Sequence, residues 1–231
     1  FIPLILAHLL GDFFFFFFSW VAAKEKKRLG SVYLYLHVFI YMALVMIFLW
    51  DINLWWIAVI VGVTHFIIDG IKLLFQTSKT KRTWFFVDQL LHFAVIALLS
   101  VVYFPYFRWD DFLNPESLKL ITAAVFLSVP SSIIIKTLIS IWTPVTVDHS
   151  KLQTESLVNA GKYIGILERL LVFVFIIVNH WEGVGFMIAA KSVFRFSDLE
   201  EAKQRKLTEY VLIGTLLSFG IAVITGILVK I

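Results

Sequence analysis

Three pairs of histidine and aspartate, each separated by four positions, lie inside the most hydrophobic stretches of the sequence. The pairs are His8 with Asp12, His65 with Asp69, and Asp88 with His92. Residues four positions apart share one face of a helix, with Cβ atoms about 5–6 Å apart. Each pair can therefore present an imidazole and a carboxylate together. These are the donors that Zn, Mn and Fe accept in proteins, and a carboxylate can bridge two ions.

The depth of these residues predicts one site shared by several helices. A further histidine, His37, stands alone in another hydrophobic stretch. The pairs lie roughly 4 to 13 residues, and His37 about five residues, from the helix ends that carry the basic loops; at about 1.5 Å per residue these depth ranges overlap at roughly 10–15 Å. Ionisable groups are costly inside a membrane and mark a functional site by default. We predict one or two divalent ions (Zn, Mn or Fe) bound by the three pairs, with Asp12 and His37 also as candidate catalytic residues. His37 would complete the ligand shell or act as a base.

Two other interpretations of the same residues stay open. Histidine–aspartate hydrogen bonds between helices can simply hold a bundle together. Chains of aspartate and histidine also form proton or ion pathways in membrane proteins. The absence of cysteine excludes thiolate ligands and cysteine nucleophiles.

The composition identifies the elements that must position these residues. Of 231 residues, 60% are hydrophobic and 16% are charged, and the mean hydropathy is +0.90. Soluble domains are about half apolar and about a quarter charged. A membrane-spanning helix needs about 20 mostly apolar residues. We therefore predict an all-α polytopic transmembrane helix bundle of seven to eight spans, at residues 1–21, 33–50, 54–75, 84–107, 117–142, 163–180, 184–196 and 210–229.

The charged loops predict the orientation of the chain. Lysine and arginine gather after the first, third, fifth and seventh predicted spans, and acidic residues dominate the loops between. Cytoplasmic loops carry such an excess of basic residues, so we expect a multi-pass protein of the bacterial inner membrane. The net charge of +4 is spread over short clusters and does not indicate nucleic-acid binding.

Two halves of the chain are predicted, with different polar residues. The four-span half, 1–107, contains the histidine–aspartate pairs, and the half 108–231 carries cytoplasmic loops at 143–162 and 197–209. We expect contact with membrane lipids throughout. A partner protein or a second copy of the chain could dock on these two loops.

A group of cations in the second half could recognise a phosphate. Several cations at one depth can hold the phosphate of a lipid, and the candidates are Lys136, Arg169, Lys191 and Arg195. Glu168 and Glu209 would position them. The alternative is an ion-pair network that packs helices and reaches the interface. Pro130 lies within the fifth predicted span and is expected to kink it.

Several motifs resemble a bacterial membrane family. The segment LILAHLLGDF near the start, the lone histidine of the second span, THFIID in the third and DQLLH in the fourth are similar to the family known as domain of unknown function 3307. The later segments GKYIGILERLL, AAKSVFRF and EYVLIGTLLS resemble the second half of its longer members. Where such proteins usually have a mixed polar stretch after GDF, this chain has Phe14 to Phe18. The resemblance implies a polytopic inner-membrane protein, and the histidine–aspartate pattern is loosely similar to that of membrane-bound metal-dependent hydrolases.

Three functions are compatible with the sequence. The first is an intramembrane metal-dependent hydrolase that acts from the cytoplasmic leaflet on an amphiphilic, lipid-phosphate-like substrate. The second is a proton or metal-ion transporter that uses the same histidine–aspartate cluster. The third is a non-catalytic membrane subunit that docks a partner.

Overall fold

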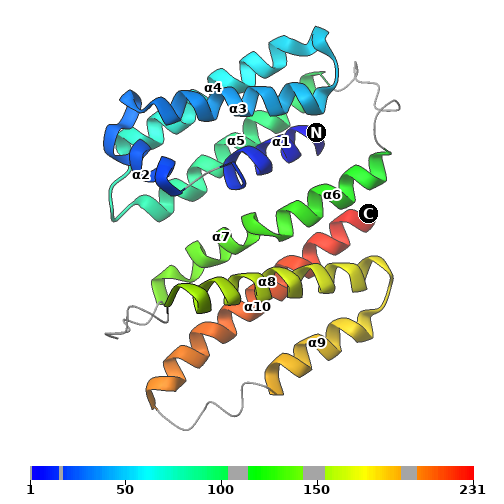
Figure 1. The fold of residues 1–231 in the computed structure, drawn as a ribbon. Coiled ribbons are helices and arrows are strands. Elements are labelled where there is room, and N and C mark those ends of the chain that lie inside the picture. Colours follow the sequence, from blue (N-terminus) through cyan, green and yellow to red (C-terminus); the bar gives the residue numbers. More distant parts are fainter. Residues whose placement is uncertain (1, 16–17, 104–113, 143–153, 194–201) are drawn as a thin grey trace. The chain divides into compact units, whose positions relative to one another are not determined.

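The computed structural model describes residues 2–15, 18–103, 114–142, 154–193 and 202–231, and within these ranges the chain is helical with no strand. It falls into two units, unit 1 (Phe1–Thr122) and unit 2 (Ala123–Ile231), which are described separately. Figure 1 shows the order of the helices. Of the loops predicted at 143–162 and 197–209, residues 143–153 and 197–201 lie outside the described residues. The rest is helical rather than loop, because residues 154–162 belong to α8 (Thr154–Ile177) and residues 202–209 belong to α10 (Ala202–Lys230).

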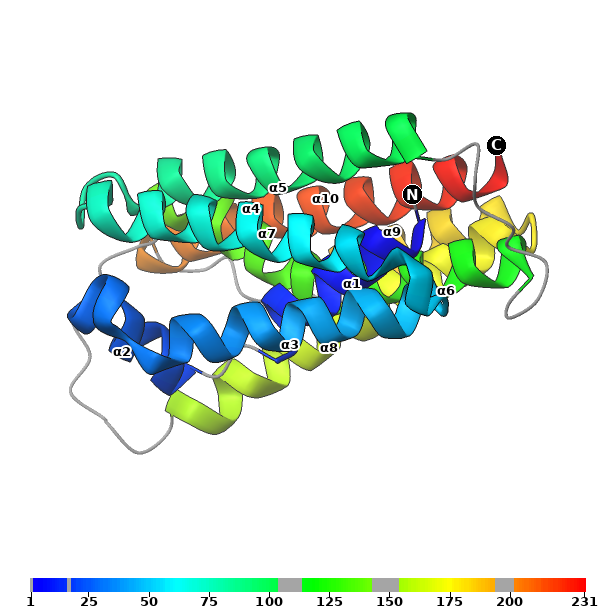
Figure 2. The ribbon, with the colours of Figure 1, turned by 90° about the horizontal axis from the view of Figure 1, so that it is seen from above.

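Unit 1 is built around a four-helix bundle. Helix α1 (Ile2–Phe13) packs on α3 (Val32–Leu49), α3 packs on α4 (Trp55–Phe75), and α4 packs on α5 (Lys81–Tyr103). Contacts between α5 and α1 close the ring. The short helix α2 (Phe18–Lys27) packs against α3 at one end of the bundle (Figures 1 and 2).

The helices of unit 1 bury one stripe each and expose apolar residues elsewhere. In α3 the buried side chains recur every three or four positions, at Leu34, His37, Tyr41, Val45 and Leu49, which is the period of one helix face. The other faces of α3 expose large apolar side chains. Exposed apolar surface of this extent is typical of a helix that lies in lipid.

Each buried stripe of the bundle is divided into an apolar part and a polar part. From the C-terminal end of α5 toward its N-terminus, the buried residues are first Leu99 and Ile96, which are apolar, and then His92 and Asp88. Buried apolar residues also adjoin the histidines of α1, α3 and α4 on this side, and they meet in one core at the same end of the bundle. We name this core the apolar layer; it consists of Leu4, Ala7, Tyr41, Val45, Leu49, Ile57, Ala58, Val61, Ile96 and Leu99. The histidines and aspartates therefore form a second layer, next to the apolar one. On the other side of the polar residues, Leu34 of α3 and Leu73 of α4 are buried as well.

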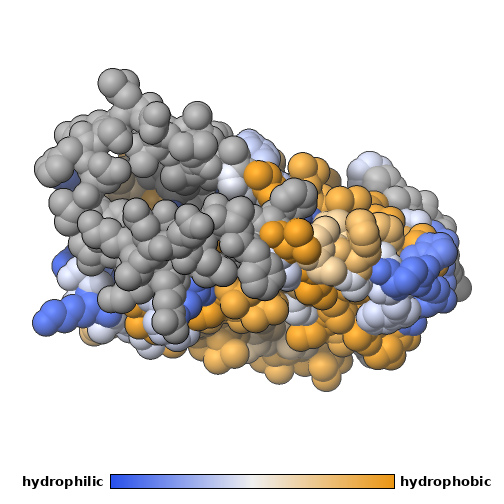
Figure 3. All heavy atoms as spheres, turned by 90° about the horizontal axis from the view of Figure 1, so that it is seen from below, coloured by the Kyte–Doolittle hydropathy of each residue, from blue (hydrophilic) through white to orange (hydrophobic). Residues whose placement is uncertain are grey.

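Five helical segments among the described residues are long and apolar enough to cross a membrane. They are Val32–Leu49, Ile52–Phe75, Lys81–Val102, Pro115–Trp142 and Glu209–Lys230. Figure 3 shows broad hydrophobic areas on one face of the molecule, with hydrophilic residues toward the ends. The prediction of a membrane protein is thus supported, whereas the predicted count of seven to eight spans stays a prediction.

The first predicted span, 1–21, does not form one continuous helix. Helix α1 ends at Phe13, and the amides of Phe14 and Phe15 both donate to the carbonyl of Leu10. A new helix, α2, begins at Phe18 and is rich in lysine. At 12 residues, α1 is shorter than a full span.

Unit 2 contains the end of α6 (Pro115–Leu127), α7 (Val129–Ile139), α8 (Thr154–Ile177), α9 (Trp181–Val193) and α10 (Ala202–Lys230). Helix α8 packs against α7, α9 and α10. Its contact with α10 is close, because a Cβ atom added at Gly226 would lie 2.9 Å from Cγ2 of Ile176. The segment 184–196 was predicted as a short span, and α9 is correspondingly short at 13 residues.

The fifth predicted span is interrupted near its proline, as expected. Helix α6 ends at Leu127 and α7 begins at Val129, with Pro130 in the first turn of α7. Proline has no N–H and its ring displaces the carbonyl four residues before it. Here the carbonyl of Phe126 accepts a hydrogen bond from the hydroxyl of Ser131, at 2.7 Å.

Candidate metal centre

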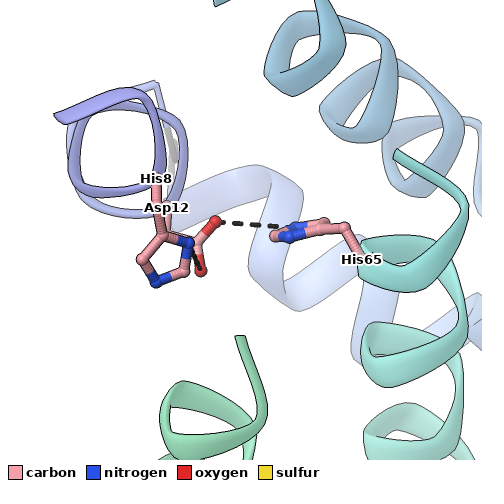
Figure 4. Close-up of side chains that lie close together, drawn as sticks. All are labelled: His8, Asp12 and His65. Carbon is pink, nitrogen blue, oxygen red and sulfur yellow. Dashed lines mark ion pairs between the residues drawn. The ribbon is translucent and has the colours of Figure 1, made fainter. Parts of the chain in front are cut away.

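The bundle of unit 1 brings all seven predicted residues into one buried cluster, and Asp12 lies at its centre. Oδ1 of Asp12 is 3.4 Å from Nε2 of His37 and 3.5 Å from Nε2 of His65. These two nitrogens are 3.0 Å apart. Three helices, α1, α3 and α4, thus point one donor atom each at a common point. Figure 4 shows the carboxylate of Asp12 directed from α1 toward His65 on α4.

The size of this triangle matches the ligand shell of one metal ion. Donor atoms that surround a tetrahedral ion at about 2.0–2.1 Å lie about 3.3 Å from one another. The three separations, 3.0, 3.4 and 3.5 Å, bracket that value. The positions of the donors are therefore compatible with one Zn, Mn or Fe ion without rearrangement of the helices.

His8 provides a fourth donor on the same side, and Gln89 fixes which of its nitrogens faces Asp12. The amide nitrogen of Gln89 donates to Oδ2 of Asp12 at 3.2 Å and to Oδ2 of Asp88 at 3.3 Å. Its oxygen is 3.3 Å from Nε2 of His8, so Nε2 must be the protonated nitrogen in a neutral ring. The lone pair of Nδ1 then faces Oδ2 of Asp12 at 3.8 Å. A proton on Nδ1 or a metal ion between the two atoms would satisfy both of them.

The unsatisfied hydrogen-bonding atoms of Asp12 and His8 also favour a bound metal ion. Among the described residues, Oδ1 of Asp12 and Nδ1 of His8 are buried and meet the geometry of no hydrogen bond. Buried polar atoms are normally paired, and an unpaired carboxylate oxygen is costly. A metal ion would satisfy both atoms. We call His8, Asp12, His37 and His65 the imidazole side of the cluster.

The remaining residues form a second group that contains lysines. Asp69 accepts a hydrogen bond from Lys24 at 3.1 Å, and Asp88 accepts one from Lys72 at 2.8 Å. Nε2 of His92 is 3.7 Å from an oxygen of each aspartate. We call Lys24, Asp69, Lys72, Asp88 and His92 the lysine side.

The two sides touch through aromatic rings. The ring of His92 stacks on that of His65, with centroids 4.1 Å apart and planes at 9°. The imidazole side and the lysine side therefore belong to one site.

Four residues of this site were not predicted from the sequence, although the positions of two of them in the sequence could have indicated a role. Lys72 lies three positions after Asp69 inside a predicted span, and Gln89 lies within the DQLLH segment. Tyr41, whose ring centroid is 4.4 Å from that of His65, looks like an ordinary core residue. Lys24 belongs to a run of basic residues that reads as a loop.

The cations predicted to bind phosphate lie in unit 2, and the described ones make different contacts. Arg169 is buried and donates to the carbonyls of Leu127 and Ser128, at 2.6 and 3.0 Å, and to the hydroxyls of Ser132 and Ser218, at 2.5 and 3.1 Å.

The other predicted cations differ among themselves in their surroundings. Lys191 donates to Glu168, and Lys136 is exposed. Arg195 lies outside the described residues. These four cations remain a prediction as a phosphate site.

Comparison with known proteins identifies the family. The family profile described as protein of unknown function (DUF3307) matches residues 1–118. The chain belongs to the DUF3307 family. Neither curated proteins nor solved structures give a match to this chain.

The part of the chain that matches DUF3307 contains the whole cluster. Both the imidazole side and the lysine side lie between His8 and His92, as does Gln89, and therefore within residues 1–118. The match ends shortly before the boundary of unit 1 at Thr122. The candidate metal centre of this DUF3307 protein is thus a property of the family part, whereas the Arg169 cluster lies outside it.

Proposed function

We propose that unit 1 is a membrane-embedded metal-dependent hydrolase of the bacterial inner membrane. Its substrate would be an amphiphilic molecule of the lipid-phosphate type that enters from the cytoplasmic leaflet. The observation that carries this proposal is the triangle of donor atoms around Asp12, in which Oδ1 faces two imidazole nitrogens and has no hydrogen bond among the described residues.

The charge of the cluster favours uptake of one divalent ion. With neutral imidazoles, three aspartates and two lysines leave one net negative charge. One divalent ion turns this into one net positive charge. A second would leave three positive charges in a buried place, which is costly. We therefore expect one ion on the imidazole side.

Each residue then has a distinct task. His8, Asp12 and His65 would hold the ion, and Gln89 would orient His8 as an outer-shell partner. A bound divalent ion lowers the pKa of water to about 7 and so supplies hydroxide at neutral pH. His37, which faces both Asp12 and His65, would complete the shell or accept the proton of the attacking water.

The apolar layer favours an enzyme over a transporter. A transport pathway needs polar groups on both sides of its binding site. In unit 1 the cluster is followed on one side by ten tightly packed buried core side chains. The alternatives of a transporter and of a non-catalytic subunit predict different results in the experiment below.

The first test is metal analysis of the purified full chain after incubation with Zn²⁺ or Mn²⁺. We expect about one ion per chain, and loss of the ion in Asp12→Asn and in His65→Gln. Matched controls are Asp51→Asn and His180→Gln, because both residues are exposed and lie outside the cluster. Absence of metal from the wild-type protein would refute the proposed function.

The second test is turnover. The metal-loaded chain in nanodiscs that contain phosphatidic acid should release inorganic phosphate, and the Asp12→Asn variant should not. Flux of the ion into proteoliposomes without phosphate release would instead identify a transporter. Metal-free protein that co-purifies with a partner would identify a subunit.

A further inference from the structure

Lys72 is the charged residue through which the buried cluster reaches the surface of unit 1. Its side chain is 24% exposed, whereas that of its partner Asp88 is 1% exposed and those of Asp12 and Asp69 are 10% exposed. Lys72 lies one turn beyond Asp69, toward the end of α4 at Phe75. The opposite end of the cluster is closed by the apolar layer. Lys72 is therefore the most exposed charged side chain of the cluster among the described residues.

Lys72 has donors to offer. A lysine ammonium carries three N–H donors, and Asp88 accepts one of them at 2.8 Å. The ion pair with Asp88 also fixes the position of the ammonium group. Among the described residues, Asp88 is the one acceptor found for this ammonium group, which leaves N–H donors for a ligand.

A second, independent observation marks a ligand position beside Lys72. Nε2 of His92 is buried and makes no hydrogen bond with any described residue, since the oxygens of Asp69 and Asp88 are both 3.7 Å away. His92 and Lys72 both lie against the carboxylate of Asp88. Oδ1 of Asp88, which faces Nε2 at 3.7 Å, likewise makes no hydrogen bond with any described residue. With Nε2 protonated, an anionic oxygen that replaces this carboxylate oxygen beside Nε2 would accept from the ring nitrogen and from the ammonium group of Lys72.

We propose that Lys72 and His92 bind the anionic phosphate oxygens of the ligand, next to the metal on the imidazole side. The inference rests on the proposed function and names the residues that select a phosphate. With one divalent ion the cluster carries one net positive charge, which an anionic oxygen offsets. Recognition of phosphate by lysine is a point-charge interaction that suits a single tethered ammonium.

This assignment places phosphate recognition within unit 1. Arg169 and Lys191 in unit 2 already donate to groups of their own unit, whereas Lys72 stands in contact with the metal cluster itself. Lys24 would hold Asp69 in place from α2.

The experiment measures inorganic phosphate beside bound Mn²⁺ in the full chain. Mn²⁺ broadens the ³¹P resonance of a phosphate held near it, and electron paramagnetic resonance counts the bound Mn²⁺ separately. We expect strong broadening for the wild-type chain, at least a tenfold weaker phosphate affinity for Lys72→Met, and recovery in Lys72→Arg. The control is Lys81→Met, which removes a lysine at the start of α5 whose partner is the surface residue Glu25.

The outcomes separate the inference from the proposed function. Equal phosphate affinity in Lys72→Met and wild type, with Mn²⁺ bound in both, would overturn the inference alone. Loss of Mn²⁺ in Lys72→Met but not in Lys72→Arg would also overturn it, because Lys72 would then support the metal centre. If the wild type binds no Mn²⁺, the proposed function fails, and equilibrium dialysis of phosphate against the same variants still decides the role of Lys72.

A second experiment decides whether the bound phosphate group belongs to a lipid headgroup or is free phosphate. Nanodiscs with phosphatidic acid are compared with nanodiscs of phosphatidylcholine alone. If phosphatidic acid displaces inorganic phosphate, the lipid headgroup is the ligand; if it does not, Lys72 and His92 bind free phosphate.

Discussion

Asp12 in unit 1 and Arg169 in unit 2 are both charged residues in the interior of helix bundles, and their surroundings differ. Arg169 donates to four acceptors, two of them carbonyls at the break between α6 and α7. Asp12 faces three imidazoles, yet its Oδ1 makes no hydrogen bond among the described residues. The guanidinium of Arg169 thus makes four hydrogen bonds within its own unit, whereas the carboxylate of Asp12 faces three imidazoles at distances of 3.4 to 3.8 Å.

This difference separates two reasons for burying a charge. Arg169 of α8 donates to the carbonyls of Leu127 and Ser128 at the break between α6 and α7, and to hydroxyls of α7 and α10, so its interactions stabilise the packing of α7, α8 and α10. Asp12 and its histidines gain nothing comparable from one another. Polar clusters that leave atoms unpaired in the folded chain are candidates for ligand binding.

The largest expected effect is the loss of stability in Arg169→Met. The change removes four hydrogen bonds and leaves buried carbonyls without a donor. Bonds to charged groups contribute about 1.5–3 kcal/mol each in soluble proteins and interhelical bonds in membranes about 0.6 kcal/mol, so we expect a total loss of about 3 kcal/mol. The measurement is unfolding in mixed micelles by titration with dodecyl sulfate. A loss below about 1 kcal/mol would contradict the structural role of Arg169.

A slightly smaller effect is expected from metal in unit 1. Mn²⁺ at 100 times its Kd should stabilise the chain by about 2.7 kcal/mol. Hydrogen exchange, followed by mass spectrometry, should slow in α3 and α4. Asp12→Asn should abolish this protection and Arg169→Met should retain it. Equal protection in both variants would mean that the ion binds elsewhere.

Two glycines allow the units to be compared at matched packing. A Cβ atom would lie 2.9 Å from Cδ2 of Tyr41 at Gly11, and equally close to Ile176 at Gly226. Overpacking costs about 1–3 kcal/mol of stability, and the higher helix propensity of alanine offsets about 1 kcal/mol of this loss. We expect similar losses of about 1 kcal/mol in Gly11→Ala and Gly226→Ala. Only Gly11→Ala should weaken metal binding, measured by isothermal titration, because Asp12 is the next residue.

The smallest expected effect is a gain in stability rather than a loss. In metal-free protein, Asp12→Asn removes the charge of a buried carboxylate whose Oδ1 makes no hydrogen bond among the described residues, and it should raise the free energy of unfolding by about 1 kcal/mol. Unfolding in dodecyl sulfate after treatment with a chelator measures it. A clear loss of stability would show that protons on the histidines already compensate Asp12, which would favour the proton-pathway interpretation.

Much of the fold and of the cluster could be predicted from the sequence. The spacing of four positions puts His65 and Asp69 on one helix face, and the structure brings these faces together in the bundle. The hydrophobic stretches gave α3, α4 and α5 within a few residues. Pro130 located the interruption between α6 and α7.

The residues that escaped prediction are those whose partners are distant in the chain. A lysine at the end of a span normally reaches outward to the interface, and only the packing of α2 against the bundle turns Lys24 toward Asp69. Arg169 finds its acceptors 41 and 42 positions away, at Ser128 and Leu127. Hydropathy also cannot place the end of α1 at Phe13, because the residues that follow it are as apolar as those before.

The apolar layer bears on whether the cluster would let protons leak across a membrane. A bacterial membrane stores energy as a proton gradient, and chains of histidine and aspartate that span it would let protons leak. In unit 1 the titratable residues occupy one end of the bundle and the ten side chains of the apolar layer occupy the other. In the proposed enzyme, no chain of histidine and carboxylate side chains would cross unit 1 through the apolar layer, so the reaction centre would not by itself provide a proton path across the membrane.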